Sequence, residues 1–420
     1  MSQSRRMLVI DTAYTYKMMV ERRLLDLVTS RDLDGYFERV WACHPFATLL
    51  EPEDAPDRFG PPVIRVLSPV HTLIEGKVGR FRWLRTIASA NFLISQLSLL
   101  LLLLRLVRRE RIDLIRSEDP LYNGLLAWIV ARLTGRPLVI GVWGNPGEIR
   151  RNSKRPLMPR LFRTVSAEEK VERFVLRRAD LALAQNEDNR RFILSAGVPP
   201  DRAVVFRLGN ALDPAHFMSP DKRPSGVEDL AEASAGRPVL LVISRLERIK
   251  LVDHAVRALS ELHRRGRQAT LLIAGDGPML TELEQLAAEL GVASQVKFLG
   301  NCSQDWFVQV IPRVDAVISP LTGRALAEAA LGGAPVVAYD VDWHSELIVD
   351  GETGELVPYF DIMALADALE RLLDDPSRAR RMGCALRERT MRLLDPVAAR
   401  EMQAATYDRL LRDHRTARHP

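Results

Sequence analysis

The chain has 420 residues, of which 47% are apolar and 27% charged. This composition is typical of a folded protein with two or three domains, and it excludes disordered, collagen-like and coiled-coil architectures. The net charge of +5 hides an asymmetry, because residues 1–215 carry 34 Lys and Arg against 24 Asp and Glu (+10) while the remainder carries −5.

Short apolar runs alternate with helical patterns from the amino terminus onward, which predicts parallel sheets wrapped by helices. In the first half we expect strands at 7–10, 40–43, 63–66, 114–115, 138–141, 181–184 and 204–206. A leucine-rich run at 92–104 is shorter than the roughly 20 apolar residues that a spanning helix needs. It predicts a buried helix, with a monotopic membrane anchor as the alternative because four arginines follow within 105–111.

A second basic segment, residues 150–163, contains six cations and no acid. Its apolar members Leu157, Met158, Leu161 and Phe162 fit docking to a membrane surface or a lipid diphosphate, and an ordinary solvated loop is the alternative. Together with the basic first half, the segment predicts contact with an anionic membrane surface.

Residues 214–238 are rich in residues that favour turns, which predicts a linker between domains. Beyond it we expect strands at 239–243, 270–274, 296–298, 316–318 and 336–338, then helices at 379–390 and 396–412. The fold class is therefore α/β, with two facing doubly wound, Rossmann-like domains. We expect these at 1–215 and 238–395, joined by a linker at 216–237, with a final helix in 396–420 that packs back on the first domain.

The stretch 320–338 is the most informative, because it predicts a loop, a glycine turn, a short helix and a buried strand. A loop that enters a helix presents free backbone N–H groups and the positive end of the helix dipole, which suit phosphate. These groups would come from Thr322, Gly323, Arg324 and Ala325. Glu328, one turn later in a helix of small apolar residues, could accept hydrogen bonds from sugar hydroxyls.

Two cations, Arg245 and Lys250, follow the apolar run at 239–243 and could meet the same diphosphate. We assign both as catalytic, since fixed cations stabilise the charge that builds on a leaving phosphate. Two solvated charges at a strand end are the alternative. Side-chain cations in this role would make a metal unnecessary, so we expect neither a metal nor a cofactor.

The second half resembles the retaining glycosyltransferases of family 4 (glycosyl transferases group 1), which have the GT-B fold. The resemblance is carried, in family order, by residues 210–217, 244–250, 274–278, 296–300, 328–338 and 350–354. It implies that the 238–395 domain binds a nucleotide sugar, with Gly275, Gly277 and Phe298 at the donor site. Pro320 stands where the family has the first of two glutamates, and Leu251 where a glycine follows its lysine.

The first domain would then hold the acceptor. Trp143, at a strand end where the family often has histidine, and His71, which follows an expected strand, are our acceptor-side candidates. A structural role is the alternative for each, since Trp at a strand end is commonly part of the core.

These features predict a glycosyltransferase, hexosyl- or related, that moves a sugar with retention from a nucleotide diphospho-sugar to a saccharide or lipid-linked acceptor. The setting would be cell-envelope polysaccharide or glycolipid biosynthesis. A non-catalytic GT-B partner subunit, favoured by Pro320, and another nucleotide-sugar enzyme such as an epimerase are the alternatives. No nucleic-acid module is recognisable. Three scattered cysteines and a polar first segment predict the cytoplasm, with peripheral contact at the inner face of the membrane.

Overall fold

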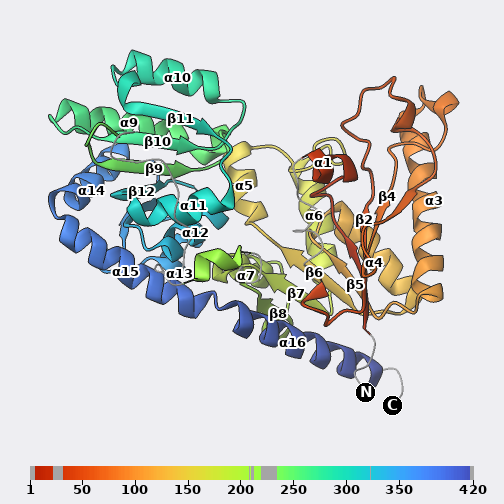
Figure 1. The fold of residues 1–420 in the computed structure, drawn as a ribbon. Coiled ribbons are helices and arrows are strands. Elements are labelled where there is room, and N and C mark those ends of the chain that lie inside the picture. The colour runs from red at the N-terminus through yellow and green to blue at the C-terminus, as the bar shows by residue number, and fades with distance from the viewer. Residues whose placement is uncertain are drawn as a thin grey trace. The chain divides into compact units, whose positions relative to one another are not determined.

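A computed structural model describes residues 5–21, 32–207, 209, 212–218, 234–321 and 323–416 (Figure 1). The chain divides into two compact units, Met1–Arg207 with Val397–Pro420, and Leu208–Pro396. The division follows Arg207, eight residues before the boundary expected from the sequence. Most of the linker predicted at 216–237 lies outside the described residues.

The first unit is built on an eight-stranded sheet in the order β3-β4-β2-β1-β5-β6-β7-β8. Its strands are β1 (Arg6–Ile10), β2 (Arg39–His44), β3 (Val63–Val66), β4 (His71–Glu75), β5 (Leu114–Ser117), β6 (Leu138–Val142), β7 (Leu181–Ala184) and β8 (Ala203–Val205). The prediction of a wholly parallel sheet is wrong at one edge, where β3 runs antiparallel to β4. The sequence analysis missed β4 because its five residues mix polar and apolar side chains.

Helices cover both faces of this sheet. They are α1 (Tyr16–Glu21), α3 (Ala88–Arg109), α4 (Tyr122–Thr134), α5 (Pro146–Ser153), α6 (Val165–Leu176), α7 (Glu187–Ser195) and α16 (Pro396–Thr416). Along β1, Leu8 and Ile10 pack into the cluster beneath α3 and α4, while the alternate residues Met7 and Val9 pack toward Tyr407 of α16. The alternation places the final helix against the back of the first unit's sheet.

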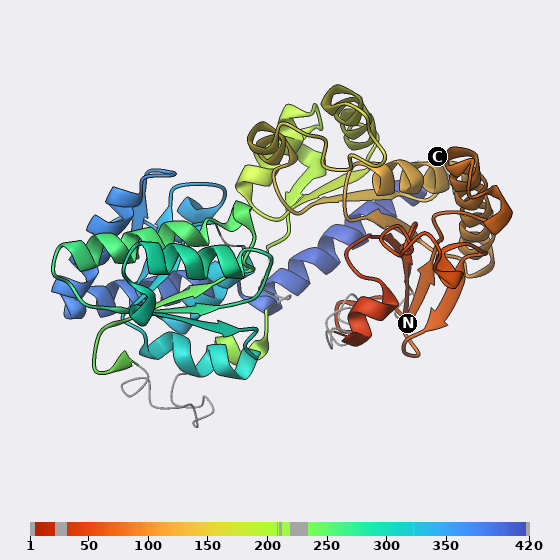
Figure 2. The same cartoon turned by 90° about the horizontal axis from the view of Figure 1, so that it is seen from above.

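The second unit has a six-stranded parallel sheet in the order β11-β10-β9-β12-β13-β14, with helices on both faces (Figure 2). The strands are β9 (Val239–Ile243), β10 (Thr270–Ala274), β11 (Val296–Gly300), β12 (Ala316–Ser319), β13 (Val336–Tyr339) and β14 (Glu355–Val357). The helices are α9 (Val252–Arg264), α10 (Leu280–Glu289), α11 (Gln304–Val310), α12 (Arg324–Gly332), α13 (His344–Leu347), α14 (Ile362–Asp374) and α15 (Pro376–Leu393).

Strand order tells where each unit can bind a ligand. Open parallel sheets bind ligands outside the carboxyl ends of their strands, at the point where the order of strands reverses. That point lies between β1 and β5 in the first unit and between β9 and β12 in the second. The loops after these four strands are therefore the places to examine.

Candidate functional site

The loop after β9 carries both predicted catalytic cations. It ends in a short 3₁₀ turn, Arg248–Lys250, and α9 begins directly after Leu251. Leu251 adopts the left-handed conformation (φ 55°), which glycine adopts without strain and which is unusual for a residue with a side chain. Its buried side chain joins the core of the second unit, and this packing holds the strained residue in place.

Arg245 and Lys250 share one electrostatic environment. Burial lowers the pKa of Lys250, and the neighbouring Arg245 charge lowers it further, while Glu247 and Asp342 partly offset both effects. The Arg245 guanidinium donates a hydrogen bond to Glu247 Oε1 at 2.7 Å, and its side chain is 68% exposed. Two like charges held this close favour the arrival of an anion, and the exposed Arg245–Glu247 pair costs little to open.

Gly275 and Gly277 follow β10 and press against the β9 loop. A Cβ on Gly275 would lie 1.8 Å from the carbonyl oxygen of Ser244, and one on Gly277 would lie 2.5 Å from that of Leu246. Gly275 also has a φ of 144°, which side-chain-bearing residues rarely adopt. These glycines therefore hold the Arg245 loop against the β10 loop; the donor contacts assigned to them stay a prediction.

The amino end of α12 lies beside the β9 loop, because β12 and β9 are neighbouring strands. Gly323 is its N-cap, no side chain caps it, and a Cβ there would meet nothing within 4 Å. The helix therefore starts with uncapped N–H groups beside open space, as the phosphate prediction requires. Ala325 packs partly against the core, and Thr322 lies outside the described residues.

Glu328 is almost wholly buried, with 3% of the residue exposed. Its Oε1 accepts a hydrogen bond from Arg324 Nε at 2.9 Å, so the two predicted donor-site residues form an ion pair one turn apart. A sugar hydroxyl would share the carboxylate with Arg324. The four-residue spacing is the signal that could have revealed this pair from the sequence.

Phe298 lies in β11, the edge strand, opposite Ile273 of β10. Its half-buried ring packs on the core cluster of the second unit. The structure thus gives Phe298 a packing role, and its contact with a nucleotide stays a prediction.

The sequence analysis passed over Asp342. It follows β13 at the same edge of the sheet, and its charge acts on Lys250. The signal was present, because Asp340-Val341-Asp342 is an Asp-x-Asp pair at a strand end. Among the residues that the structure describes, no group of three or more His, Cys, Asp or Glu could hold a metal ion. Metal independence stays a prediction.

The first unit separates the two acceptor-side candidates. His71 begins β4, opposite Val40 at the start of β2, and it is buried. It therefore lies at the amino end of the sheet, and its assignment to the ligand-binding edge is wrong because β4 was missed. Trp143 directly follows β6, at the carboxyl edge, and is 36% exposed. Its Nε1 donates a hydrogen bond to Glu118 Oε2.

Carboxylates that the sequence analysis did not single out surround the switch point of the first unit. Asp11 follows β1, and Glu118 and Asp119 follow β5. Burial raises the pKa of Asp119 to about 7, against the lowering effect of a hydrogen bond from Leu121 N at 2.8 Å. Asn123 donates to both Asp119 and Thr12 and so ties the two loops together. The candidate acceptor edge is thus acidic.

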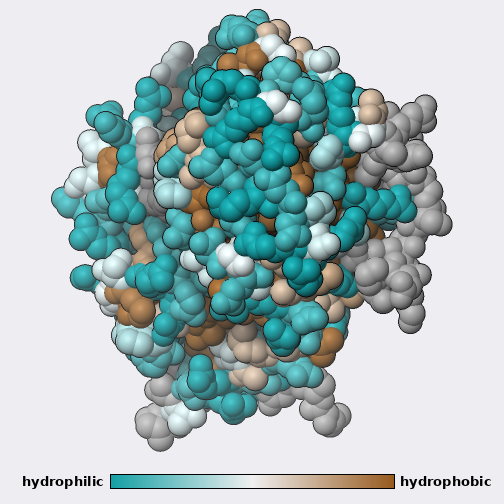
Figure 3. Space-filling model, turned by 90° about the vertical axis from the view of Figure 1, so that its left-hand side faces the viewer, coloured by the Kyte–Doolittle hydropathy of each residue, from teal (hydrophilic) through white to brown (hydrophobic). Residues whose placement is uncertain are grey.

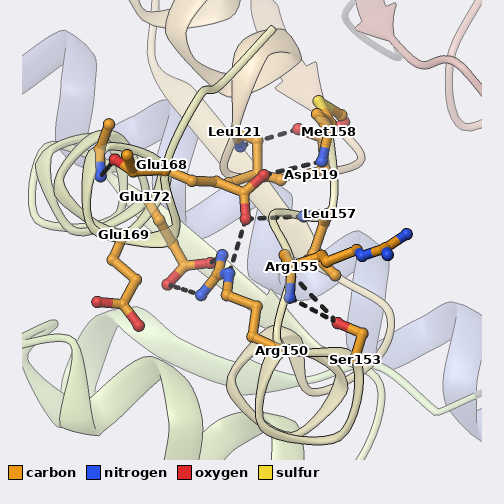
Figure 4. A network of polar contacts seen from close by, with 12 residues as sticks. Asp119, Leu121, Arg150, Ser153, Arg155, Leu157, Met158, Glu168, Glu169 and Glu172 are labelled. Carbon is orange, nitrogen blue, oxygen red and sulfur yellow. Dashed lines mark hydrogen bonds and ion pairs between the residues drawn. The ribbon is translucent and has the colours of Figure 1, made fainter. Parts of the chain in front are cut away.

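The basic segment at 150–163 is only partly a surface loop (Figure 4). Arg150 is buried, with its Nε donating to Glu168 at 2.7 Å and its terminal nitrogens donating to Glu172. Glu168 also accepts from the backbone N–H groups of Leu157 and Met158. The prediction that Arg150 faces a membrane is therefore wrong, because Arg150 forms buried ion pairs with Glu168 and Glu172 of α6. Arg151, Lys154, Arg155, Arg160 and Arg163 remain exposed.

Two doubly wound units place this chain among the α/β proteins that bind ligands at the switch points of their parallel sheets. Residues 230–389 match the family described as Glycosyl transferases group 1, and residues 20–209 match the Glycosyl transferase 4-like domain. The chain belongs to the group 1 glycosyltransferases of the GT-B fold.

Relatives and solved structures agree with this placement. The chain is 33% identical over 268 residues to alpha-D-kanosaminyltransferase of Streptomyces kanamyceticus (61% of this chain, 66% of that one). It is 35% identical over 225 residues to D-inositol 3-phosphate glycosyltransferase of Nocardia farcinica (50% and 49%). The matches thus span half to two thirds of these relatives.

Among solved structures, Anabaena HepE in complex with UDP has a TM-score of 0.68 at 20% identity (96% of this chain, 99% of that one). Sucrose-phosphate synthase from Thermosynechococcus elongatus has a TM-score of 0.72 at 18% identity (97% and 100%). At such identities the likeness establishes the shared fold.

Proposed function

We propose that the protein transfers a sugar, with retention of anomeric configuration, from a nucleotide diphospho-sugar to a saccharide or lipid-linked acceptor. The observation that carries the proposal is that Arg245 and Lys250 follow β9 while the uncapped start of α12 follows the neighbouring strand β12, at the switch point of the second unit. The names of the relatives, which transfer sugars, and the UDP held by the HepE structure support it.

The chemistry follows from this arrangement. Transfer breaks the bond between the anomeric carbon and the diphosphate oxygen, and negative charge builds on the leaving phosphate. Lys250 and Arg245 stabilise that charge, and the N–H groups at the start of α12 add fixed dipoles. Burial and the charge of Arg245 lower the pKa of Lys250, and a bound diphosphate would offset both effects. The side chains thus take the part of a metal ion.

The acceptor side of the proposal assigns Trp143 to stacking on a sugar face, since its ring lies half-exposed at the carboxyl edge of the first unit. We further propose a cytoplasmic protein that works at the inner face of a membrane, in envelope polysaccharide or glycolipid synthesis. The exposed cations within 151–163 and 105–111 support this setting.

A thermal-shift screen tests the donor site. UDP-, GDP-, ADP- and dTDP-hexoses should be added separately, because a ligand at a hundred times its Kd stabilises the native state by about 2.7 kcal/mol. We expect one nucleotide class to raise the Tm of the wild type and to raise that of Lys250→Ala much less. Arg248→Ala is the matched control, since Arg248 is an exposed cation that pairs with Glu282.

Release of nucleoside diphosphate, with the anomeric configuration of the product followed by NMR, then tests the reaction. A Tm that no nucleotide sugar raises would overturn the proposal. Donor binding without turnover on any saccharide or lipid acceptor would favour the non-catalytic partner subunit.

A further inference from the structure

Helix α3 has two different faces. Leu99, Leu103 and Val107 are fully buried in the core of the first unit. The polar side chains at its amino end are engaged as well, since Asn91 Oδ1 accepts from Arg80 N at 2.7 Å and Ser95 donates to Lys77 O at 2.7 Å. In the described part of the chain, α3 is the one helix long and apolar enough to cross a membrane. This packing instead keeps one side of it on the protein.

The opposite face of α3 is apolar and exposed. Leu93, Leu97 and Leu101 are 67%, 56% and 45% exposed and follow one another every four residues. Residues four apart are neighbours on the surface of a helix, and the exposed Arg105 and Arg109 continue the row, which winds around α3 by about 40° per step. We call these five residues the α3 stripe. The helix contains no Asp or Glu, so the stripe combines apolar and cationic groups only.

The stripe begins at a pocket of about 850 Å³ in the first unit. Ser89, one four-residue step before Leu93, lines it together with Arg85, Arg160 and Phe92. Arg160 donates to the carbonyl of Leu49, and in the described part of the chain Arg85 is exposed and makes no ion pair. Glu53 and Asp54 also line the pocket, so its three cations, Arg58 included, outnumber its acids by one.

Exposed aromatic residues lie just before α3. Trp83 is 75% exposed, Phe81 is 39% exposed, and their rings lie 5.8 Å apart, with Ile87 (57% exposed) following. Scattered apolar residues are normal on a protein surface, as in the face shown in Figure 3, where brown appears only in separate spots. With the three leucines of the α3 stripe, these make six large apolar residues on one helix and its approach segment, so they are not scattered.

We propose that the α3 stripe is a docking surface for an anionic lipid bilayer and that the pocket at its amino end receives the head group of an anionic lipid. The leucines enter the boundary between head groups and acyl chains, with α3 lying along the surface. Arg85 at one end and Arg105 and Arg109 at the other reach the lipid phosphates. The charge of the stripe selects an anionic partner, and its aromatic neighbours suit the interface. The inference deepens the proposed function by naming a membrane lipid as the acceptor class.

Vesicle co-sedimentation tests the stripe. Wild type should pellet with vesicles of phosphatidylcholine plus phosphatidylglycerol and much less with phosphatidylcholine alone. Replacing Leu93, Leu97 and Leu101 together by Ser should weaken this binding about ten-fold or more. Met363→Ser is the matched control, because Met363 is 49% exposed on the second unit. It should pellet like the wild type.

The pocket cation has its own pair of variants. Arg85→Gln should weaken binding to anionic vesicles about five-fold, the effect of one cation near a charged surface. Lys170→Gln, which removes an exposed cation from α6, should change binding less. If the site takes a lipid, inorganic phosphate should displace the protein no more than sodium chloride of the same ionic strength does, and stronger displacement by phosphate would show a free-phosphate site instead.

The outcomes separate this inference from the proposed function. Equal pelleting on neutral and anionic vesicles, a leucine variant that pellets like wild type, or no pelleting at all would overturn the docking surface. Each variant is also screened for a nucleotide-sugar thermal shift, which reports on the second unit. Loss of vesicle binding with an intact donor shift confirms the inference, and absence of any donor shift in the wild type overturns the proposed function alone.

Discussion

The two units have the same kind of sheet but place charge differently around its switch point. In the second unit, a short loop between β9 and α9 keeps Arg245 and Lys250 together and partly in solvent. In the first, the corresponding edge carries Asp11, Glu118 and Asp119. The comparison teaches that the second unit is prepared for an anion before any ligand arrives, whereas the first favours hydroxyl-bearing or cationic groups at its edge.

The units also differ in how they use arginine. The first unit is the basic half of the sequence, yet Arg150 is buried and pairs with two acids. The other cations of the 150–163 segment are exposed to solvent. In the second unit, Arg245 and Arg248 keep exposed side chains and make single ion pairs. Net charge therefore says little about which cations can meet a ligand; burial decides that.

The largest expected effect comes from breaking the buried pair of the first unit. Arg150→Ala should lower the free energy of unfolding by about 3–5 kcal/mol, because Glu168 and Glu172 lose their cation while staying buried. Urea unfolding measures the loss. Arg248→Ala, which removes an exposed pair with Glu282 from the second unit, should cost about 1 kcal/mol or less. Similar losses in both variants would abolish the contrast between the units.

For catalysis we expect the opposite: replacing cations of the second unit should have the large effect. Lys250→Ala should lower kcat/KM while leaving the fold intact, and the loss should correspond to about 2–4 kcal/mol of transition-state stabilisation. Arg245→Ala should lower kcat/KM as well. Steady-state kinetics with the donor found by thermal shift measures this. Arg248→Ala, two residues away, should keep wild-type kinetics. Wild-type turnover in both site variants would show that the leaving-group assignment is wrong.

Sequence reasoning located the second unit better than the first for physical reasons. The strands β9, β10 and β12 are continuous apolar runs, as expected where both sheet faces are covered, and their loops are short. The same method failed in the first unit at β4, whose five residues mix polar and apolar side chains without a regular pattern, and His71 was misplaced as a result. The pairing of Arg150 with two acids of α6 and the raised pKa of Asp119 could not be predicted, since both depend on how the folded elements bury these side chains.

The acidic edge of the first unit predicts a pH dependence. The pKa of Asp119 is raised by burial from 3.8 to about 7, so this group stabilises the fold most at low pH and loses that contribution as pH rises through 7. Asp119→Asn should therefore gain stability relative to wild type as pH rises from about 4 to about 7, and the difference should stay constant above that range. A single carboxyl can change the free energy of unfolding by at most about 1.4 kcal/mol per pH unit, because it binds one proton.

Urea unfolding across that pH range measures the difference. Asp201→Asn, at an exposed carboxyl of the same unit, should give a curve parallel to that of the wild type. Parallel curves for Asp119→Asn as well would show that Asp119 ionises at its ordinary pKa and that the edge is more solvated than the structure implies.

The smallest expected effect is that of metal removal. If Lys250, Arg245 and the start of α12 neutralise the diphosphate, excess EDTA should leave turnover unchanged within error.

The strongest alternative to a metal-independent site is offered by Asp340 and Asp342. They form an Asp-x-Asp pair just after β13, and the charge of Asp342 already raises the pKa of Lys250. Activity lost in EDTA and restored by Mg²⁺ or Mn²⁺ would assign the diphosphate to a metal. Asp342→Asn would then lose that restored activity, whereas in a metal-independent enzyme it should only lower the pKa of Lys250 further, because a raising influence is gone. The comparison between the units rests on this point, since a metal would place an acidic, cation-binding edge in both.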